Sequence, residues 1–166
     1  MYKIYFVELD ETLDELIIAK LLSFVSSEKQ QRVQNIKFPI NRKLTLYSEM
    51  LVRVLVCNMF EVKNNQLSFI TNEYGKPQLA GFPNFHFNIS HTRNAMVVAI
   101  GEKPVGVDVE QVKKADLNIA PRFFTEQENT FILDKVSNQD KRFYEIWTIK
   151  EAYIKYRVLT RTEENL

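Results

Sequence analysis

The stretch Val105-Gly106-Val107-Asp108-Val109-Glu110 alternates apolar and acidic side chains after its glycine. This alternation predicts a β-strand, because successive side chains of a strand point to opposite faces. Asp108 and Glu110 would then share one face, about 7 Å apart along the strand. Two carboxylates in this position repel each other unless a cation lies between them. A hard divalent cation prefers oxygen ligands, so the stretch predicts a metal site.

A third acidic side chain, Glu151, lies in a helix predicted from about Lys141 to Tyr156. Glu151 and Lys155 are four residues apart and therefore neighbours on the helix surface. Lys150 falls inside a continuous apolar arc, where an unpaired ammonium is costly, so it should reach solvent or meet an anion. The arc consists of Phe143, Ile146, Trp147, Ile149, Tyr153 and Ile154.

Both acidic segments also have simpler interpretations. Glu151 and Lys155 alone would more often form an ordinary surface ion pair. Asp108 and Glu110 alone could equally form the polar face of an edge strand. A metal-dependent nuclease also fits an acidic strand followed by a Glu/Lys pair, but the chain lacks an extended basic groove.

The composition describes a compact chain of nearly balanced charge. Of 166 residues, 45% are hydrophobic, and 22 basic against 21 acidic side chains leave a formal charge of +1. No overall field favours nucleic acid, so an anion must be bound by a local cluster. The lone cysteine, Cys57, rules out an internal disulfide and a thiolate metal cage. No apolar run is long enough for a membrane and no signal-peptide pattern is present, so we expect a cytoplasmic protein.

Further strands and helices are expected around the acidic stretch. Lys3 to Leu9, Phe85 to Ser90 and Ala95 to Ile100 read as strands, and the last of these should form a hairpin with the acidic stretch through residues 101–104. A long amphipathic helix begins near Asn41. Thr125 and Glu128 form a capping box before another helix.

The segment Phe87-Asn88-Ile89-Ser90-His91, the acidic stretch and the Trp147–Lys155 helix occur in this order. Together they resemble the 4'-phosphopantetheinyl transferases of the surfactin-synthetase-activating type. The signatures of that family are a (V/I)G(V/I)D(V/I)E strand and a (W/F)(S/T/C)xKE(A/S)xxK helix, and both are complete here. The resemblance implies an enzyme, a holo-carrier-protein synthase. It would transfer 4'-phosphopantetheine from coenzyme A to a serine of an apo acyl or peptidyl carrier protein and release adenosine 3',5'-bisphosphate.

The resemblance also implies a fold and a set of catalytic residues. The fold would be α+β, with two similar halves related by a pseudo-twofold, residues 1–101 and 102–166, and coenzyme A in the cleft between them. Three carboxylates would hold Mg²⁺, or Mn²⁺ in its place, and Glu151 would also accept the serine proton through a water. Lys155 would stabilise the leaving phosphate, and Lys150 would add positive charge beneath the site. The metal ligands implied are Asp108, Glu110 and Glu151.

Coenzyme A would be held mainly by the first half. The 3'-phosphate positions implied by the resemblance are Lys29, Arg32, Lys37, Thr45, Ser90 and His91. The turn on the adenine would be Tyr74, Gly75, Lys76 and Pro77. Without the resemblance, the basic residues would read as a solvated helix face and Gly75 and Pro77 as turn residues. Arg122-Phe123-Phe124 resembles the region that meets the carrier protein, although aromatic residues there are as often core.

After Lys155 the chain departs from the family pattern, because residues 156–166 are polar, lack glycine and end. We therefore expect an incomplete second half with an exposed strand edge, low stability and a tendency to self-associate. The alternative function is a catalytically impaired, truncated homologue that only binds coenzyme A or the carrier protein. Neither nucleic acid nor a membrane is expected as a partner.

Overall fold

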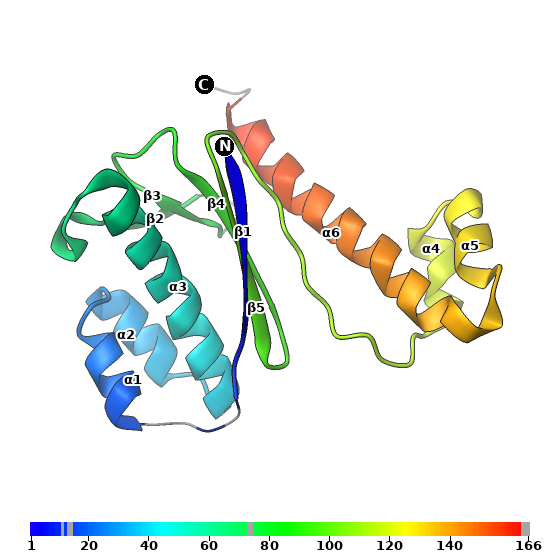
Figure 1. Ribbon diagram of the computed structural model, residues 1–166, viewed down its shortest axis with the longest axis horizontal. Helices are drawn as coiled ribbons and strands as arrows, with labels where there is room; N and C mark the ends of the chain where they lie inside the picture. The colour runs from blue at the N-terminus through cyan, green and yellow to red at the C-terminus, as the bar shows by residue number, and fades with distance from the viewer. Residues whose placement is uncertain (11, 13–14, 73–74, 164–166) are drawn as a thin grey trace.

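A three-stranded antiparallel sheet forms the centre of the protein, in the order β1-β5-β4 (Figure 1). The computed structural model describes residues 1–10, 12, 15–72 and 75–163, with side chains described as far as Arg157. Strand β5 pairs with β1 along one edge and with β4 along the other, and all of its residues are buried. The α+β class predicted from the sequence is confirmed. The three strands are β1 (Tyr2–Glu8), β4 (His86–Thr92) and β5 (Ala95–Gly101).

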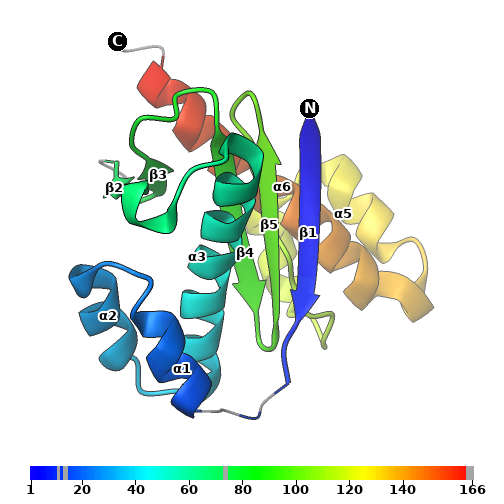
Figure 2. The same ribbon diagram turned by 60° about the vertical axis from the view of Figure 1, so that its left-hand side comes forward.

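One face of the sheet is covered by helix α3, and α1 and α2 lie on the far side of that helix (Figure 2). The alternation predicted for residues 85–90 explains this packing, because Phe85 and Phe87 both point toward Val52 and Val56 of α3. A short hairpin of β2 and β3 follows α3 in the chain. The bounds are α1 (Glu15–Leu22), α2 (Ser27–Gln34), α3 (Pro39–Phe60), a 3-10 turn (Asn64–Gln66), β2 (Phe69–Thr71) and β3 (Pro77–Leu79).

The acidic stretch 105–110 is not a strand, and the predicted hairpin with residues 95–100 is wrong. Both edges of β5 are already occupied by β1 and β4, so no edge remains for a third partner. The stretch instead runs across the second face of the sheet. There Val107 is buried against Val97 and Ala99. The alternation of apolar and acidic residues therefore shows only that one side of the segment is buried. A strand with one buried face gives the same pattern.

The rest of the chain forms a second core of helices, and no strand follows Gly101 within the described residues. Helix α5 begins with the capping box of Thr125 and Glu128, as predicted. Figure 1 shows α4 and α5 at the end of α6 that lies away from the sheet. The bounds are η2 (Leu117–Ile119), α4 (Ala120–Phe123), α5 (Glu126–Leu133), η3 (Val136–Asn138) and α6 (Gln139–Glu163). None of the helices described here combines the length and the apolar character needed to cross a bilayer.

The apolar arc of α6 is buried only in its first half. Phe143 is buried in the second core, but Ile149, Tyr153 and Ile154 are 65%, 59% and 53% exposed. The apolar arc is continuous along the sequence, but it is not buried from Ile149 onward. The reason is geometric, because α4 and α5 cover only the beginning of α6 (Figure 1).

Gly106 is the point of closest approach between the acidic stretch and α6. A Cβ added there would overlap the carbonyl oxygen of Ala152 and lie 2.6 Å from the backbone nitrogen of Tyr156. Backbone atoms of a helix have no room to give way, so only glycine fits. This contact brings the second half of α6 against the segment that carries Asp108.

We expect Gly106→Ala to lower the free energy of unfolding by about 1–3 kcal/mol, the usual cost of overpacking. Urea denaturation monitored by circular dichroism gives this value. Gly81→Asn is the control, since Gly81 has a φ of 81° with open space around it, and asparagine accepts positive φ. Equal midpoints for Gly106→Ala and the parent would show that α6 does not pack on Gly106 in solution.

Candidate active site

A cavity of about 410 Å³ lies between β4, the acidic stretch and the second half of α6. Six of the residues that the resemblance assigned to the site line this cavity. Strand β4 supplies two of the six, the acidic stretch supplies two, and α6 supplies two. The lining residues are Ile89, Ser90, His91, Asp108, Glu110, Trp147, Glu151 and Lys155.

The Asp108 carboxylate is the most enclosed charge in this cavity, with its side chain only 5% exposed. Its Oδ1 accepts hydrogen bonds from the Ser90 hydroxyl at 2.7 Å and from the Lys155 ammonium at 2.6 Å. Lys155 also donates to the Ser90 oxygen at 2.9 Å. The other oxygen, Asp108 Oδ2, is buried and has no hydrogen-bond partner. An unpartnered buried oxygen costs free energy, so it marks a place for a ligand.

Burial and neighbouring charges both change the pKa values of side chains in the cavity. Partial burial, and then repulsion by Asp108, raise the pKa of Glu110 above its ordinary value. Lys113, Lys155 and the Thr92 hydroxyl oppose this shift without cancelling it. Desolvation, and then the Lys155 ammonium, lower the pKa of His91. A cation between Asp108 and Glu110 would relieve the repulsion between these two carboxylates.

Within the described part of the chain, no group of three or more His, Cys, Asp or Glu residues is arranged to hold a metal ion. The Lys155 ammonium occupies the cationic position at Asp108. The donor chemistry nevertheless fits a hard cation, because the cavity offers carboxylate oxygens and Asp108 Oδ2 has no other partner.

The predicted adenine turn lies beside this cavity and touches the same lysine. Gly75 has a φ of 76°, which glycine adopts without strain. The Lys76 ammonium donates a hydrogen bond to the backbone carbonyl of Lys155. Pro77 begins β3, and together with Gly75 and Lys76 it lines a second cavity of about 240 Å³. Tyr74 lies outside the described residues.

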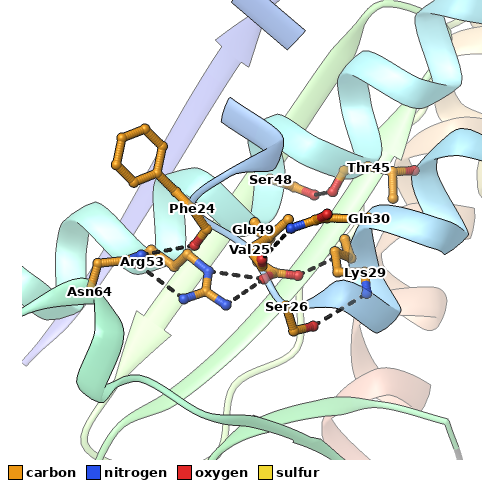
Figure 3. A network of polar contacts seen from close by, with 10 residues as sticks. All are labelled: Phe24, Val25, Ser26, Lys29, Gln30, Thr45, Ser48, Glu49, Arg53 and Asn64. Carbon is orange, nitrogen blue, oxygen red and sulfur yellow. Dashed lines mark hydrogen bonds and ion pairs between the residues drawn. The ribbon is translucent and has the colours of Figure 1, made fainter. Parts of the chain in front are cut away.

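Lys29 is engaged inside the first half of the protein (Figure 3). Its ammonium lies 3.1 Å from Glu49 Oε2, and Arg53 forms an ion pair with Glu49 Oε1 at 2.9 Å. Arg53 also donates to Asn64, whose amide donates to the carbonyl oxygen of Phe24. The sequence alone does not predict this network, because nothing in a helix sequence shows which side chains a carboxylate such as Glu49 will meet.

The other basic residues differ in their surroundings. Arg32 and Lys37 are exposed, and Thr45 is half-buried on α3. Lys150 forms an ion pair with Glu128 at 2.8 Å and is not part of the cavity lining. Of the two outcomes expected for Lys150, solvent or an anion, the structure shows the anion, which is supplied by α5. In the segment expected to meet the carrier protein, the half-exposed Phe123 packs edge-on against Trp147 at 5.6 Å between ring centroids, and Phe124 is buried.

Comparison with known proteins places the chain in a family. The family model "4'-phosphopantetheinyl transferase, N-terminal" matches residues 14–103, and that of the 4'-phosphopantetheinyl transferase superfamily matches residues 104–163. The chain belongs to the 4'-phosphopantetheinyl transferase family, and its relatives are of the Sfp type.

Three curated relatives illustrate the similarity. The chain is 36% identical to 4'-phosphopantetheinyl transferase ffp of Bacillus subtilis over 154 residues, which is 92% of the chain and 69% of the relative. It is 34% identical to 4'-phosphopantetheinyl transferase Sfp of Bacillus subtilis strain 168, with the same coverage of both chains. It is 39% identical to 4'-phosphopantetheinyl transferase gsp of Aneurinibacillus migulanus over 161 residues, which is 93% of the chain and 65% of the relative. The chain thus spans about two thirds of the length of these relatives.

Lys76 should react unusually fast with amine reagents near neutral pH. Burial, and then repulsion by Lys155, lower the pKa of Lys76 to about 8. At pH 7.5 about a quarter of its side chains would be neutral, against about one in a thousand for an ordinary lysine. We expect acetylation followed by peptide mass spectrometry to show a reaction midpoint near pH 8. The exposed Lys114 serves as the internal reference, and equal rates at Lys76 and Lys114 would contradict the assignment.

Proposed function

We propose that the chain transfers 4'-phosphopantetheine from coenzyme A to a serine of an apo acyl or peptidyl carrier protein and releases adenosine 3',5'-bisphosphate. The observation that carries the proposal is the meeting of Asp108, Glu110, Glu151 and Lys155 in one cavity. The chain belongs to a family of such transferases, which sets the reaction class. The cavity supplies the groups that this chemistry needs, namely a base, a cationic side chain and oxygen ligands.

Asp108, Glu110 and Glu151 are proposed to hold Mg²⁺, or Mn²⁺ in its place. When bound, the ion would neutralise charge that develops on the pyrophosphate of coenzyme A. Two observations support this assignment: Asp108 Oδ2 has no hydrogen-bond partner beside the Lys155 contact of Oδ1, and repulsion by Asp108 contributes, after burial, to the raised pKa of Glu110.

The side chains around these acids have separate proposed roles. Glu151 accepts the proton of the carrier serine through a water. The serine oxygen then forms the bond to the phosphopantetheine phosphorus, and the bond from that phosphorus to the adenosine bisphosphate oxygen breaks. Lys155 stabilises the leaving phosphate, and its hydrogen bonds to Asp108 and Ser90 hold the ammonium within the cavity. A catalytic role for Lys150 stays a prediction, since its ammonium pairs with Glu128.

The first half is proposed to bind the nucleotide end of coenzyme A. Exposed positive charge supports a phosphate contact for Arg32 and Lys37. Ser90 and His91 line the cavity, where a phosphate could reach them. Lys29 is paired with Glu49, so a phosphate that binds Lys29 would lie near that carboxylate. Several expectations stay predictions. They are roles for Thr45 and for residues 74–77, the division into halves 1–101 and 102–166, the pseudo-twofold relation of these halves, the incomplete second half and a cytoplasmic location.

The transfer reaction is tested by incubating apo carrier protein with coenzyme A and Mg²⁺ and measuring the carrier mass. We expect a gain of one phosphopantetheine. Asp108→Asn and Glu151→Gln should each slow the transfer by about 100-fold or more, the scale of losing one group that stabilises transition-state charge. Glu145→Gln, on the exposed side of the same helix, is the matched control and should keep the parental rate. An unmodified carrier together with measurable coenzyme A binding would support the binding-only alternative.

The exposed strand edge expected in the second half is not found, since no strand follows Gly101 in the described part of the chain. Self-association is proposed instead through apolar side chains that the fold leaves exposed. Strand β1 is a sheet edge, and its Tyr2, Ile4 and Phe6 are exposed on the same side as Tyr153 of α6. Exposed apolar edge strands favour pairing between chains. We expect light scattering to show a mass that rises with concentration, and Ile4→Lys to shift it toward the monomer. Val136→Lys changes an exposed apolar residue of η3, outside β1, and is the control. A monomer at every concentration would refute the proposal.

A further inference from the structure

One face of strand β4 carries polar side chains that the proposed reaction leaves without a full explanation. Asn88, Ser90 and Thr92 alternate along the strand and point away from α3, because Phe87 points toward it. Asn88 and Ser90 are each 7% exposed. Buried polar groups need partners, so this polar face must be matched by something that lies over the sheet.

All three side chains find their partners in the acidic stretch and the residue after it. Asn88 Oδ1 accepts a hydrogen bond from the backbone nitrogen of Val107 at 2.9 Å. The Ser90 hydroxyl donates to Asp108 at 2.7 Å. Thr92 Oγ1 accepts from the backbone nitrogen of Gln111 at 3.3 Å. The three contacts follow one another in the same order along both segments.

These contacts replace the backbone ladder that residues 105–110 lack. A segment lying across a sheet face cannot reach the backbone groups of that sheet, which are already paired within it. Side chains that rise from the face can reach it. A shift of the segment by one residue would remove the Val107 and Gln111 amides from their acceptors and turn Asp108 away from Ser90.

We propose that Asn88 and Thr92 are positioning residues that fix the register of the acidic stretch and thereby direct Asp108 and Glu110 into the cavity. The proposal deepens the proposed function, because the carboxylates positioned in this way are the proposed metal ligands. Ser90 contributes to the same row of contacts, but it also touches Lys155, so it is a poorer site for a test.

Thr92 is the position tested because it is only half-buried and has an isostere. Its hydroxyl also acts on Glu110, so the Mn²⁺ result is read together with exchange at the Gln111 amide. Thr92→Val keeps the shape and loses the acceptor, whereas Thr92→Ser keeps the acceptor. The probe is Mn²⁺ alone, titrated without coenzyme A or carrier and followed by the paramagnetic resonance signal of the free ion. We expect Thr92→Val to weaken Mn²⁺ binding by about 10- to 100-fold, the usual effect of losing a residue that orients metal ligands. Thr92→Ser should restore it to within about threefold.

Amide hydrogen exchange reports the register without any metal. Thr92→Val should speed exchange at the Gln111 amide by about three- to tenfold, the ratio that corresponds to one hydrogen bond. Asn88→Ala should do the same at Val107. Thr130→Val, on the exposed face of α5, is the matched control and should change neither exchange at these amides nor Mn²⁺ affinity.

The outcomes separate this proposal from the proposed function. Parental exchange at the Gln111 amide in Thr92→Val would overturn the positioning role whatever the Mn²⁺ affinity, because the Thr92 hydroxyl also acts directly on Glu110. Faster exchange with unchanged Mn²⁺ affinity would overturn it too, because the register would then not control the carboxylates. Failure of the parent to bind Mn²⁺ would overturn the proposed metal site, while the exchange data would still decide whether Asn88 and Thr92 hold the segment. If Asn88→Ala does not fold, the Thr92 pair alone decides the matter.

Discussion

The hydrogen-bonded ion pair between Lys155 and Asp108 ties three separate parts of the chain together. Lys155 belongs to α6, Asp108 to the stretch that crosses the sheet, and Ser90, which bonds to both, to β4. Removing one partner from a buried ion pair leaves a charge in a poorly hydrated place, which is strongly unfavourable. The position of α6 over the sheet and the shape of the cavity therefore depend on the same pair of charges.

Two constraints of the backbone support this ion pair. Strand β5 uses both of its edges inside the sheet, so the acidic stretch has to cross a face and be held by side chains. At Gly106 the stretch approaches α6 more closely than any residue with a Cβ would allow. The sheet determines where the stretch runs, and the missing side chain determines how near the helix comes. Together they place a ligand-bearing segment between two rigid elements without making it part of either.

The sequence predicted the buried side chains of residues 85–90, but it did not predict the backbone structure of residues 105–110 or the exposure of α6. The alternation at residues 85–90 correctly predicted that Phe85 and Phe87 reach the core. The two family signatures contain five of the eight residues that line the cavity, namely Asp108, Glu110, Trp147, Glu151 and Lys155. The alternation at 105–110 was misleading, because a period of two reports one buried side and carries no information about backbone hydrogen bonds. The apolar stripe of α6 was misleading for a related reason. Such a stripe does not show whether another element covers it, and Ile149, Tyr153 and Ile154 are exposed.

The buried cluster around Glu49 has a consequence for how the first half meets anions. Two cationic side chains, Lys29 and Arg53, face this single carboxylate, so the cluster retains an excess of positive charge. The Lys29 side chain is already ordered by folding, and little rotamer entropy remains to be lost when an anion approaches. The first turn of α2 therefore presents a positive charge in a fixed position, whereas Arg32 and Lys37 are exposed on the surface.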